Sequence, residues 1–177
     1  MRDIRIERWA HTLVHYSLYL KEGETIAISS TPLASPLIEA VYSEVLHVGA
    51  YPVVLLDLES LGEILLREGN ESQLTKVSPA TIATLERADA HLNISASSNP
   101  RSLNGIDPAR IAQRRSAGYA FSKQLRERES AGKFRWSGTL YPTNGYAQDA
   151  GMSLTEFEAF VFDVCFLNDP DPIARWK

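Results

Sequence analysis

RWSGTLYPTNGYAQDAGM, residues 135–152, decides the fold because it joins a strand to a short helix through a proline turn. Its first half holds aromatic and apolar residues that favour a half-buried strand: Trp136, Leu140 and Tyr141. Pro142 has no amide to donate and therefore ends the strand ladder. Thr143 is placed to cap a short helix, and Gly151 can adopt the left-handed conformation that closes one. A strand followed at once by a helix indicates an α/β protein.

A second helix is predicted directly after this stretch. Ser153 and Glu156 have the spacing of a capping box, in which each side chain binds a backbone amide of the other residue. Apolar residues then recur at helical spacing: Phe157, Phe160, Val161 and Val164. The two Asp-Pro pairs at 169–172 predict that this helix stops and that another begins. Cys165 is the single cysteine, which excludes an internal disulfide, and its place on the apolar stripe predicts a buried thiol.

Strand and helix patterns alternate along the rest of the chain. Strands are expected over 25–29, 52–57 and 90–96, and a first helix over 4–20. The run PVVLLD at 52–57 is typical of a strand buried on both faces of a parallel sheet. The sequence therefore predicts an α/β fold of the Rossmann-like or flavodoxin-like kind, with three layers and a mostly parallel sheet of about four or five strands flanked by helices. We expect residues 1–168 to form this one domain.

The first strand–helix turn argues against a dinucleotide cofactor. Asp57, at the end of the second strand, stands where dinucleotide-binding folds hold the ribose. However, the turn at 29–32, SSTP, has no glycine fingerprint, and its proline lacks the amide that a phosphate would use. We therefore expect no NAD site.

A polar crevice is predicted at the carboxyl edge of the sheet. If the strand order is 2-1-3-4, the loops after the first and third strands border the crevice in which such sheets bind ligands. Its walls would be Ser30, Thr31, Ser97, Asn99 and Arg101. Hydroxyls, an amide and a guanidinium can hydrogen-bond a peptide terminus or a phosphate. Ordinary loop polarity and helix capping explain the same residues more simply, so both interpretations stay open.

Two histidines invite a metal site that the pattern around them argues against. His11 and His15 lie four residues apart on the first predicted helix, so they could share one ion. No glutamate follows His11 in the manner of an HExxH motif, and both imidazoles lie roughly opposite the apolar stripe of that helix. We therefore predict a solvated helix face here.

Charge and hydropathy exclude several classes of partner. A long helix predicted over 107–130 is basic, with Arg110, Arg114, Arg115, Lys123, Arg126 and Arg128. The chain as a whole carries a net charge of -4, and no aromatic residues interleave with the basic ones in the manner of a nucleic-acid module. No segment approaches the ~18 consecutive apolar residues of a membrane span, and MRDIRIERWA at 1–10 has no apolar leader. We expect a cytoplasmic protein that binds neither nucleic acid nor membrane.

The decisive stretch resembles the first domain of the thermophilic metalloaminopeptidases of the aminopeptidase T and aminopeptidase S type. The resemblance is carried there by RW at 135–136, TLYPT at 139–143, AQ at 147–148 and AGMSL at 150–154. It extends to YSL at 16–18, KEGE at 21–24, VGA at 48–50, FVF at 160–162, Cys165, DPDP at 169–172 and Trp176. The resemblance therefore spans essentially the whole chain.

This resemblance implies a two-domain, usually dimeric exopeptidase that removes N-terminal residues from peptides. The family uses two divalent metal ions, such as zinc, cobalt or magnesium, and its metal ligands lie in the second domain. The resemblance thus implies no catalytic residue, metal ligand or cofactor within this chain, which alone is expected to be inactive. Its partners would be its own C-terminal catalytic domain, a peptide substrate and a second copy.

The same resemblance suggests what the chain does within such an enzyme. It would be the N-terminal domain that shapes the substrate cavity and contributes to assembly. Residues 169–177 would begin the interdomain linker, and Trp176 would contact the absent domain. Two alternatives remain: a stand-alone module of this fold that binds a peptide or small molecule, or a domain of a metal-dependent ring-cleaving dioxygenase relative.

Overall fold

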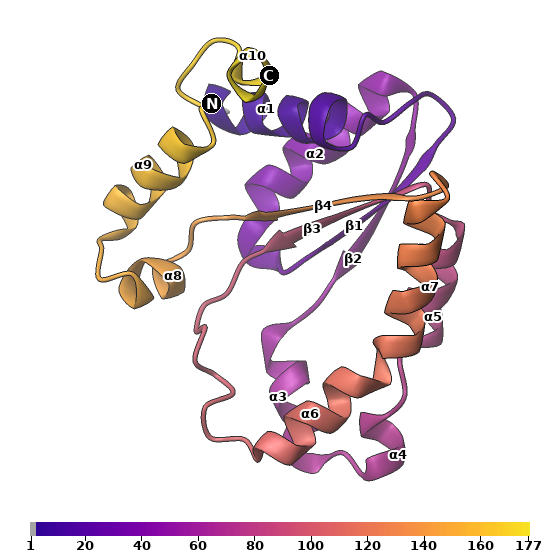
Figure 1. The fold of residues 1–177 in the computed structure, drawn as a ribbon. Coiled ribbons are helices and arrows are strands. Elements are labelled where there is room, and N and C mark those ends of the chain that lie inside the picture. The colour runs from indigo at the N-terminus through magenta and orange to yellow at the C-terminus, as the bar shows by residue number, and fades with distance from the viewer. Residues whose placement is uncertain (1–2) are drawn as a thin grey trace.

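Four parallel strands form the central sheet in the order β2-β1-β3-β4 (Figure 1). The computed structural model describes residues 3–177. The strands are β1 (Thr25–Ser30), β2 (Tyr51–Leu56), β3 (Ala90–Ser95) and β4 (Arg135–Leu140). The predicted α/β class is confirmed, and the strand order is the one on which the predicted crevice was conditional.

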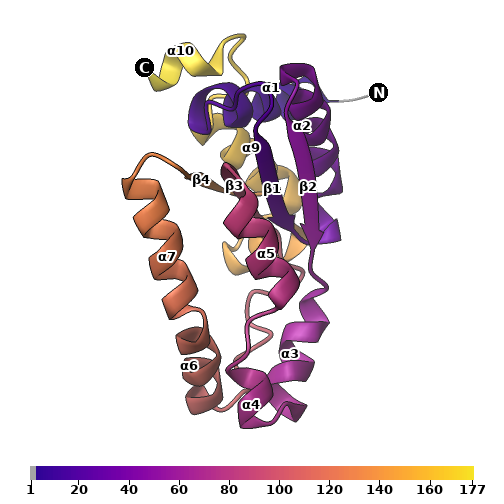
Figure 2. The ribbon, with the colours of Figure 1, turned by 90° about the vertical axis from the view of Figure 1, so that its right-hand side faces the viewer.

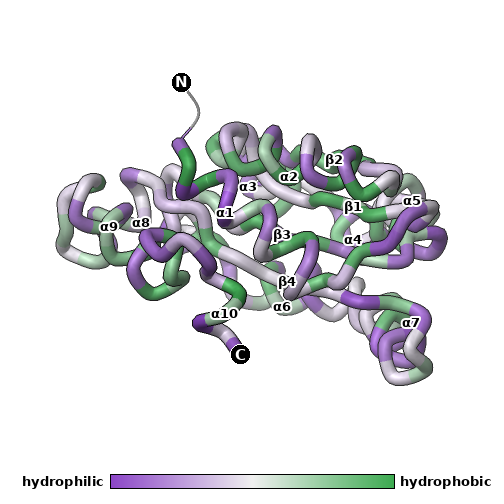
Figure 3. The backbone as a smooth tube through the Cα atoms, turned by 90° about the horizontal axis from the view of Figure 1, so that it is seen from above, coloured by the Kyte–Doolittle hydropathy of each residue, from purple (hydrophilic) through white to green (hydrophobic). Residues whose placement is uncertain are grey.

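Helices cover both faces of this sheet. They are α1 (Ile4–His11), the π-helical turn η1 (Thr12–Ser17), the 3-10 turn η2 (Pro32–Ala34), α2 (Ser35–Val48), α3 (Glu59–Glu68), α4 (Glu71–Leu74), α5 (Pro79–Arg87), α6 (Pro108–Ala117), α7 (Tyr119–Ser130), α8 (Asn144–Asp149), α9 (Leu154–Val164) and α10 (Pro172–Trp176). Figure 2 shows α5 in front of the sheet and α9 behind it. Hydropathy follows this layering, because β1 is largely green and α7 carries much purple (Figure 3). Across residues 3–177, every helix is too short or too polar to cross a membrane.

The largest core lies between the sheet and helices α1, α2 and α9. The central strands point alternate side chains into it, with Ile26 and Ile28 from β1 and Leu92 and Ile94 from β3, all almost fully buried. The helices meet them with a second buried set: Trp9, Val14, Leu37, Val41, Val45, Phe157, Val161 and Phe162. This face of the sheet therefore supplies most of the hydrophobic stabilisation.

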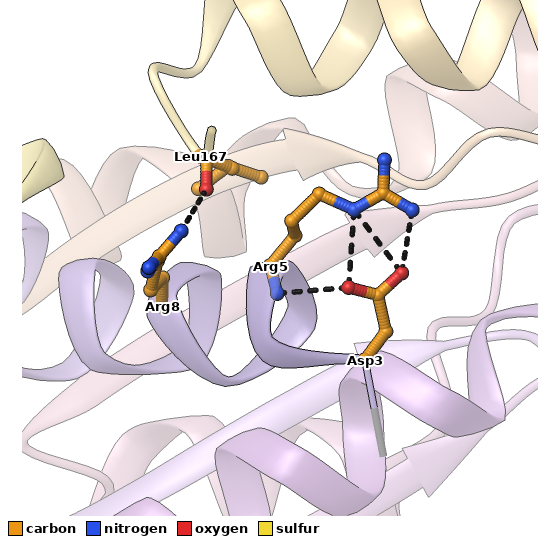
Figure 4. A network of polar contacts seen from close by, with 4 residues as sticks. All are labelled: Asp3, Arg5, Arg8 and Leu167. Carbon is orange, nitrogen blue, oxygen red and sulfur yellow. Dashed lines mark hydrogen bonds and ion pairs between the residues drawn. The ribbon is translucent and has the colours of Figure 1, made fainter. Parts of the chain in front are cut away.

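Polar contacts fix α1 at its start and against the far end of the chain. Asp3 caps α1 by accepting the Arg5 amide at 2.9 Å, and it also pairs with the Arg5 guanidinium at 2.7 Å. Figure 4 shows Arg8 reaching the carbonyl of Leu167 in the loop after α9, at 3.1 Å. The helix predicted over 4–20 ends at Ser17, and its last part is η1, in which Leu18 donates to the carbonyl of Leu13 five residues earlier.

The opposite face of the sheet is covered by α5 and α7 over a smaller core of Ala27, Leu85, Ala88 and Phe134. Helices α3, α4 and α6 form a lobe beside it with a core of their own: Leu66, Leu74 and Ile106. The prediction of one long helix over 107–130 is wrong, because the chain turns at Gly118 and forms two helices, α6 and α7. α6 thus packs in the lobe, and α7 packs near the sheet.

Arginines of α6 and α7 bind the open carbonyls at the ends of other helices. The Arg110 guanidinium donates to the carbonyl of Leu66 at the end of α3, at 2.6 Å. The Arg114 guanidinium donates to the carbonyl of Lys76 just after α4, at 2.8 Å. The Arg128 guanidinium donates to the carbonyls of Leu85 and Ala88 at the end of α5, each at 2.8 Å. The last carbonyls of a helix lack partners within it and carry partial negative charge. Three of the basic residues in 107–130, namely Arg110, Arg114 and Arg128, therefore stabilise the packing of helices.

Strand β2 corrects the prediction of a strand buried on both faces. It lies at the edge of the sheet, and Tyr51 and Leu56 are 64% and 54% exposed. The Tyr51 amide donates to the backbone carbonyl of Glu24, and the Asp57 amide donates to the backbone carbonyl of Ser30. The amides of odd-numbered residues in β2 therefore face β1. Pro52 holds an even-numbered position, where a missing amide costs no bond to the sheet. An apolar run does not by itself distinguish a central strand from an edge strand.

Candidate functional site

The predicted crevice residues on β1 serve the backbone. The hydroxyl of Ser30 donates to the carbonyl of Ile94 at 2.8 Å, and the hydroxyl of Thr31 donates to the carbonyl of Ala96 at 3.0 Å. Both bonds run from the end of β1 to the end of β3. These two hydroxyls therefore hold the ends of β1 and β3 together. Because each donates its proton to a carbonyl, neither has a proton left to donate to a ligand.

The loop after β3 is held by short-range bonds of its own side chains. Ser97 Oγ accepts the Asn99 amide at 3.2 Å, and Asn99 Oδ1 accepts the Arg101 amide at 3.1 Å. The Arg101 guanidinium pairs with Asp149 on α8, with Nη2 2.6 Å from Oδ1. This pairing leaves the crevice without an unpaired guanidinium to attract a phosphate.

An open hollow of about 440 Å³ lies between this loop and α8. Its lining is polar: Ser98, Asn99, Pro100, Arg101, Gly145, Gln148 and Asp149. The structure thus brings Asn99 and Arg101 together, while Ser30, Thr31 and Ser97 lie outside the lining. The amide groups of Asn99 and Gln148 could hydrogen-bond the backbone of a peptide. Ligand binding at this edge stays a prediction.

Glu59, at the start of α3, braces the same loop. Its carboxylate accepts the amide of Ser98 at 3.0 Å and the hydroxyl of Ser98 at 2.7 Å. Burial raises the pKa of the Glu59 carboxyl, but hydrogen bonds from Ser97 and Ser98 outweigh it and hold that pKa below its usual value. Neither Glu59 nor Asp149 was predicted, because each meets the loop only through tertiary packing.

Thr143 connects α8 to this loop, and its removal should cost stability. Its hydroxyl donates to the Ser97 carbonyl at 2.5 Å and accepts the Tyr146 amide at 3.3 Å, so it is both cap and tether. We expect Thr143→Val to lower the free energy of unfolding by about 1–3 kcal/mol. Urea denaturation checks this against Thr155→Val, an exposed threonine on α9 that should cost much less. Equal losses in the two variants would contradict the proposed tether.

His11 and His15 do not form the plain solvated face that was predicted. Helix α2 places Glu44 between them: His11 Nδ1 lies 3.0 Å and His15 Nε2 lies 2.7 Å from Glu44 Oε1. The side chain of Glu44 is 23% exposed, and His47 Nδ1 lies 3.6 Å from its other oxygen. Burial raises the pKa of Glu44, but hydrogen bonds from His11 and His15 outweigh it and hold that pKa below its usual value. Within residues 3–177, His11, His15 and Glu44 form the one group of this kind able to hold a metal ion.

Trp176 packs partly against Phe166 and is partly exposed to solvent. Its ring is edge-on to Phe166, with centroids 5.2 Å apart, and the residue is 46% exposed. Its carbonyl accepts the hydroxyl of Tyr16 at 3.1 Å, so α10 folds back on the first helical segment. It also shares a hollow with Ser137, Gly138 and Thr139 on the outer edge of β4. Contact with a second domain stays a prediction.

Comparison with known proteins identifies a family and a similar solved structure. Residues 2–177 match the model of a family described as thermophilic metalloprotease (M29). The structure is similar to that of wild-type AmpT from Thermus thermophilus, with a TM-score of 0.78 and 20% sequence identity. That alignment covers 97% of this chain and 44% of the AmpT chain, so this chain spans less than half of its length. A search among curated proteins found no match.

Proposed function

The chain belongs to the thermophilic metalloprotease (M29) family, and from this we propose that it is the N-terminal, non-catalytic domain of an aminopeptidase. Such an enzyme would use two divalent metal ions to remove N-terminal residues from peptides. One observation carries the proposal: the fold match covers nearly all of this chain and less than half of AmpT. A protein as long as AmpT has room for a second domain beside one of this size.

The side chains of residues 3–177 do not fit a two-metal centre. Such a centre holds its ions about 3.5–4 Å apart, and both ions need ligands from the protein. The one group that converges, His11, His15 and Glu44, supplies one carboxylate and two imidazoles, with His47 beside it. These donors suffice for one ion at most. We therefore propose that the two catalytic ions bind outside this domain, and we assign no step of peptide hydrolysis to its residues.

Two surfaces would serve such an enzyme. The polar hollow at the end of β3 would form part of the substrate cavity, where Asn99 and Gln148 offer amide groups to a peptide backbone. Strand β4 would contact the second domain, because Trp136, 57% exposed, lies in a hollow on its α7 side and Trp176 lies in another hollow beside the same strand. Exposed aromatic residues are favoured at interfaces. Contact between two copies of the full-length enzyme would complete the assembly.

Hydrolysis of aminoacyl anilides tests this assignment. Leucyl- and arginyl-p-nitroanilide are incubated with the 177-residue chain and, in parallel, with the two-domain protein of which we propose that it is a part. Each protein receives cobalt, zinc or magnesium. We expect release of nitroaniline only from the longer protein, because the metal ligands would lie in its second domain. Turnover by the 177 residues alone would contradict a non-catalytic role.

A second candidate function is supported by the open hollow of about 440 Å³ beside α8. A domain with this hollow could act alone as a binding module for peptides. In that case, short peptides should raise the melting temperature of the isolated chain, because a ligand that binds only the folded state stabilises it. An accessory domain would show this stabilisation only within the longer protein.

A further inference from the structure

We propose that His11, His15 and Glu44 form a binding site for one divalent transition-metal ion, with zinc as the best fit. The three potential ligand atoms all lie within 4.8 Å of one another. Imidazole nitrogens with one carboxylate oxygen suit zinc and its neighbours, whereas magnesium and calcium prefer oxygen ligands alone. The proposal goes beyond the peptidase assignment, since it concerns this domain by itself.

The backbone beneath the three side chains is held firmly. His11 follows Ala10 and His15 follows Val14, and both of these neighbours are buried against α2 and the sheet. Glu44 precedes Val45, which is completely buried. Each proposed ligand is thus one residue away from a core position. A metal site needs ligands whose elements are fixed in this way, because the ion tolerates little error in position.

The separations require a small adjustment to admit an ion. Zinc holds nitrogen and oxygen ligands at about 2.0–2.2 Å, so neighbouring ligand atoms in a tetrahedral site lie roughly 3.3 Å apart. The nitrogens of His11 and His15 lie 3.0 and 2.7 Å from Glu44 Oε1. These two separations must therefore widen by about 0.3 Å and about 0.6 Å to admit the ion. The side chains of His11 and His15 are 54% and 37% exposed, which leaves them free to make these shifts.

The nitrogens that face Glu44 are the atoms that would bind the metal. A neutral imidazole carries one proton, which can occupy either nitrogen, so each ring can present a bare nitrogen to an ion. Metal ligands must be deprotonated, and binding would replace the two hydrogen bonds with bonds to the ion. The bonds in the structure therefore already direct both nitrogens toward the carboxylate oxygen that would share the ion.

The three side chains are accessible from solvent, so an ion and a fourth ligand can reach them. His11 and Glu44 line an open hollow of about 570 Å³, which also includes Glu7 and Asp171. The carboxylates would attract a hydrated cation into this hollow. Arg8 lines it as well, but its guanidinium donates to the Leu167 carbonyl. The fourth position of a tetrahedral ion can be filled by water or by the exposed imidazole of His47, 3.6 Å from Glu44 Oε2.

Calorimetric titration of zinc chloride into the 177-residue chain, purified without a histidine tag, tests the site. We expect one ion per chain. Loss of an outer-shell partner alone typically weakens metal binding 10–100-fold, so His15→Ala or Glu44→Gln should weaken it by at least ~10-fold. Glu39→Gln on α2 and His91→Ala on β3 are matched controls that should leave the affinity unchanged. No saturable heat, or equal affinity in all four variants, would overturn the proposal.

A second measurement covers the case in which a variant fails to fold. Unsubstituted chain is treated with diethyl pyrocarbonate with and without zinc, and the modified histidines are identified by mass spectrometry. We expect zinc to protect His11 and His15 but to leave the modification of His91 unchanged. Equal modification with and without zinc would count against the site. Magnesium chloride in place of zinc should give no protection, because the group is rich in nitrogen.

Discussion

Trp9→Ala should lower the free energy of unfolding by about 3–5 kcal/mol. Trp9 is 3% exposed and connects α1 to two elements from the far end of the chain. Its ring lies 6.4 Å from that of Tyr141 after β4 and 6.0 Å, edge-on, from that of Phe162 on α9. Alanine would leave a cavity at the junction of these three segments. A typical domain has only about 5–15 kcal/mol of stability, so the loss would be large.

Guanidinium denaturation followed by circular dichroism measures this loss, with Trp136→Ala as the matched control. Trp136 is also a tryptophan, but it is 57% exposed on β4. Its replacement should cost about 1 kcal/mol or less. A loss from Trp9→Ala no larger than that of the control would show that Trp9 does not join α1 to α9.

Gly145→Ala should destabilise the chain by about 2–3 kcal/mol, because the added methyl group would meet backbone atoms. A Cβ at this position would lie 2.5 Å from the carbonyl oxygen of Ser98 and 2.7 Å from that of Ser97. Backbone atoms cannot move aside as the end of a flexible side chain can. The variant must therefore push α8 away from the loop and strain the Thr143 tether to Ser97.

Gly62→Ala is the matched control for this prediction. Gly62 lies within α3, and a Cβ there would have no neighbour within 4 Å. Alanine loses less conformational entropy than glycine on entering a helix, so this variant should be more stable by about 0.5–1 kcal/mol. Thermal unfolding of both variants gives the comparison. If Gly145→Ala were as stable as Gly62→Ala, α8 would not be packed as closely on the loop as the structure has it.

Local signals in the sequence predicted local structure well. Thr143 caps α8, and Ser153 with Glu156 forms the predicted capping box at the start of α9. Gly49 and Gly151 take the left-handed conformation where α2 and α8 end. These signals depend on residues a few positions apart, so the sequence alone contains everything that produces them. The alternation of such elements was enough to predict the parallel sheet.

Contacts between distant segments could not be predicted in this way. Glu44 is 33 residues from His11, and Asp149 is 48 residues from Arg101. Each pairing depends on the relative placement of two elements, which no periodicity in the sequence reveals. The same limit applies to Gly118, since whether a helical pattern bends at a glycine depends on which cores its two halves join.

Strand β2 has a consequence for aggregation. A free strand edge can pair with another chain and start an intermolecular sheet. The amides that face away from β1 belong to even-numbered positions, and at 52 the amide is absent because the residue is proline. An approaching strand would therefore find no donor at the start of β2 and would have to begin its ladder at Val54. Pro52 thus protects an otherwise apolar edge while leaving the bonds to β1 intact.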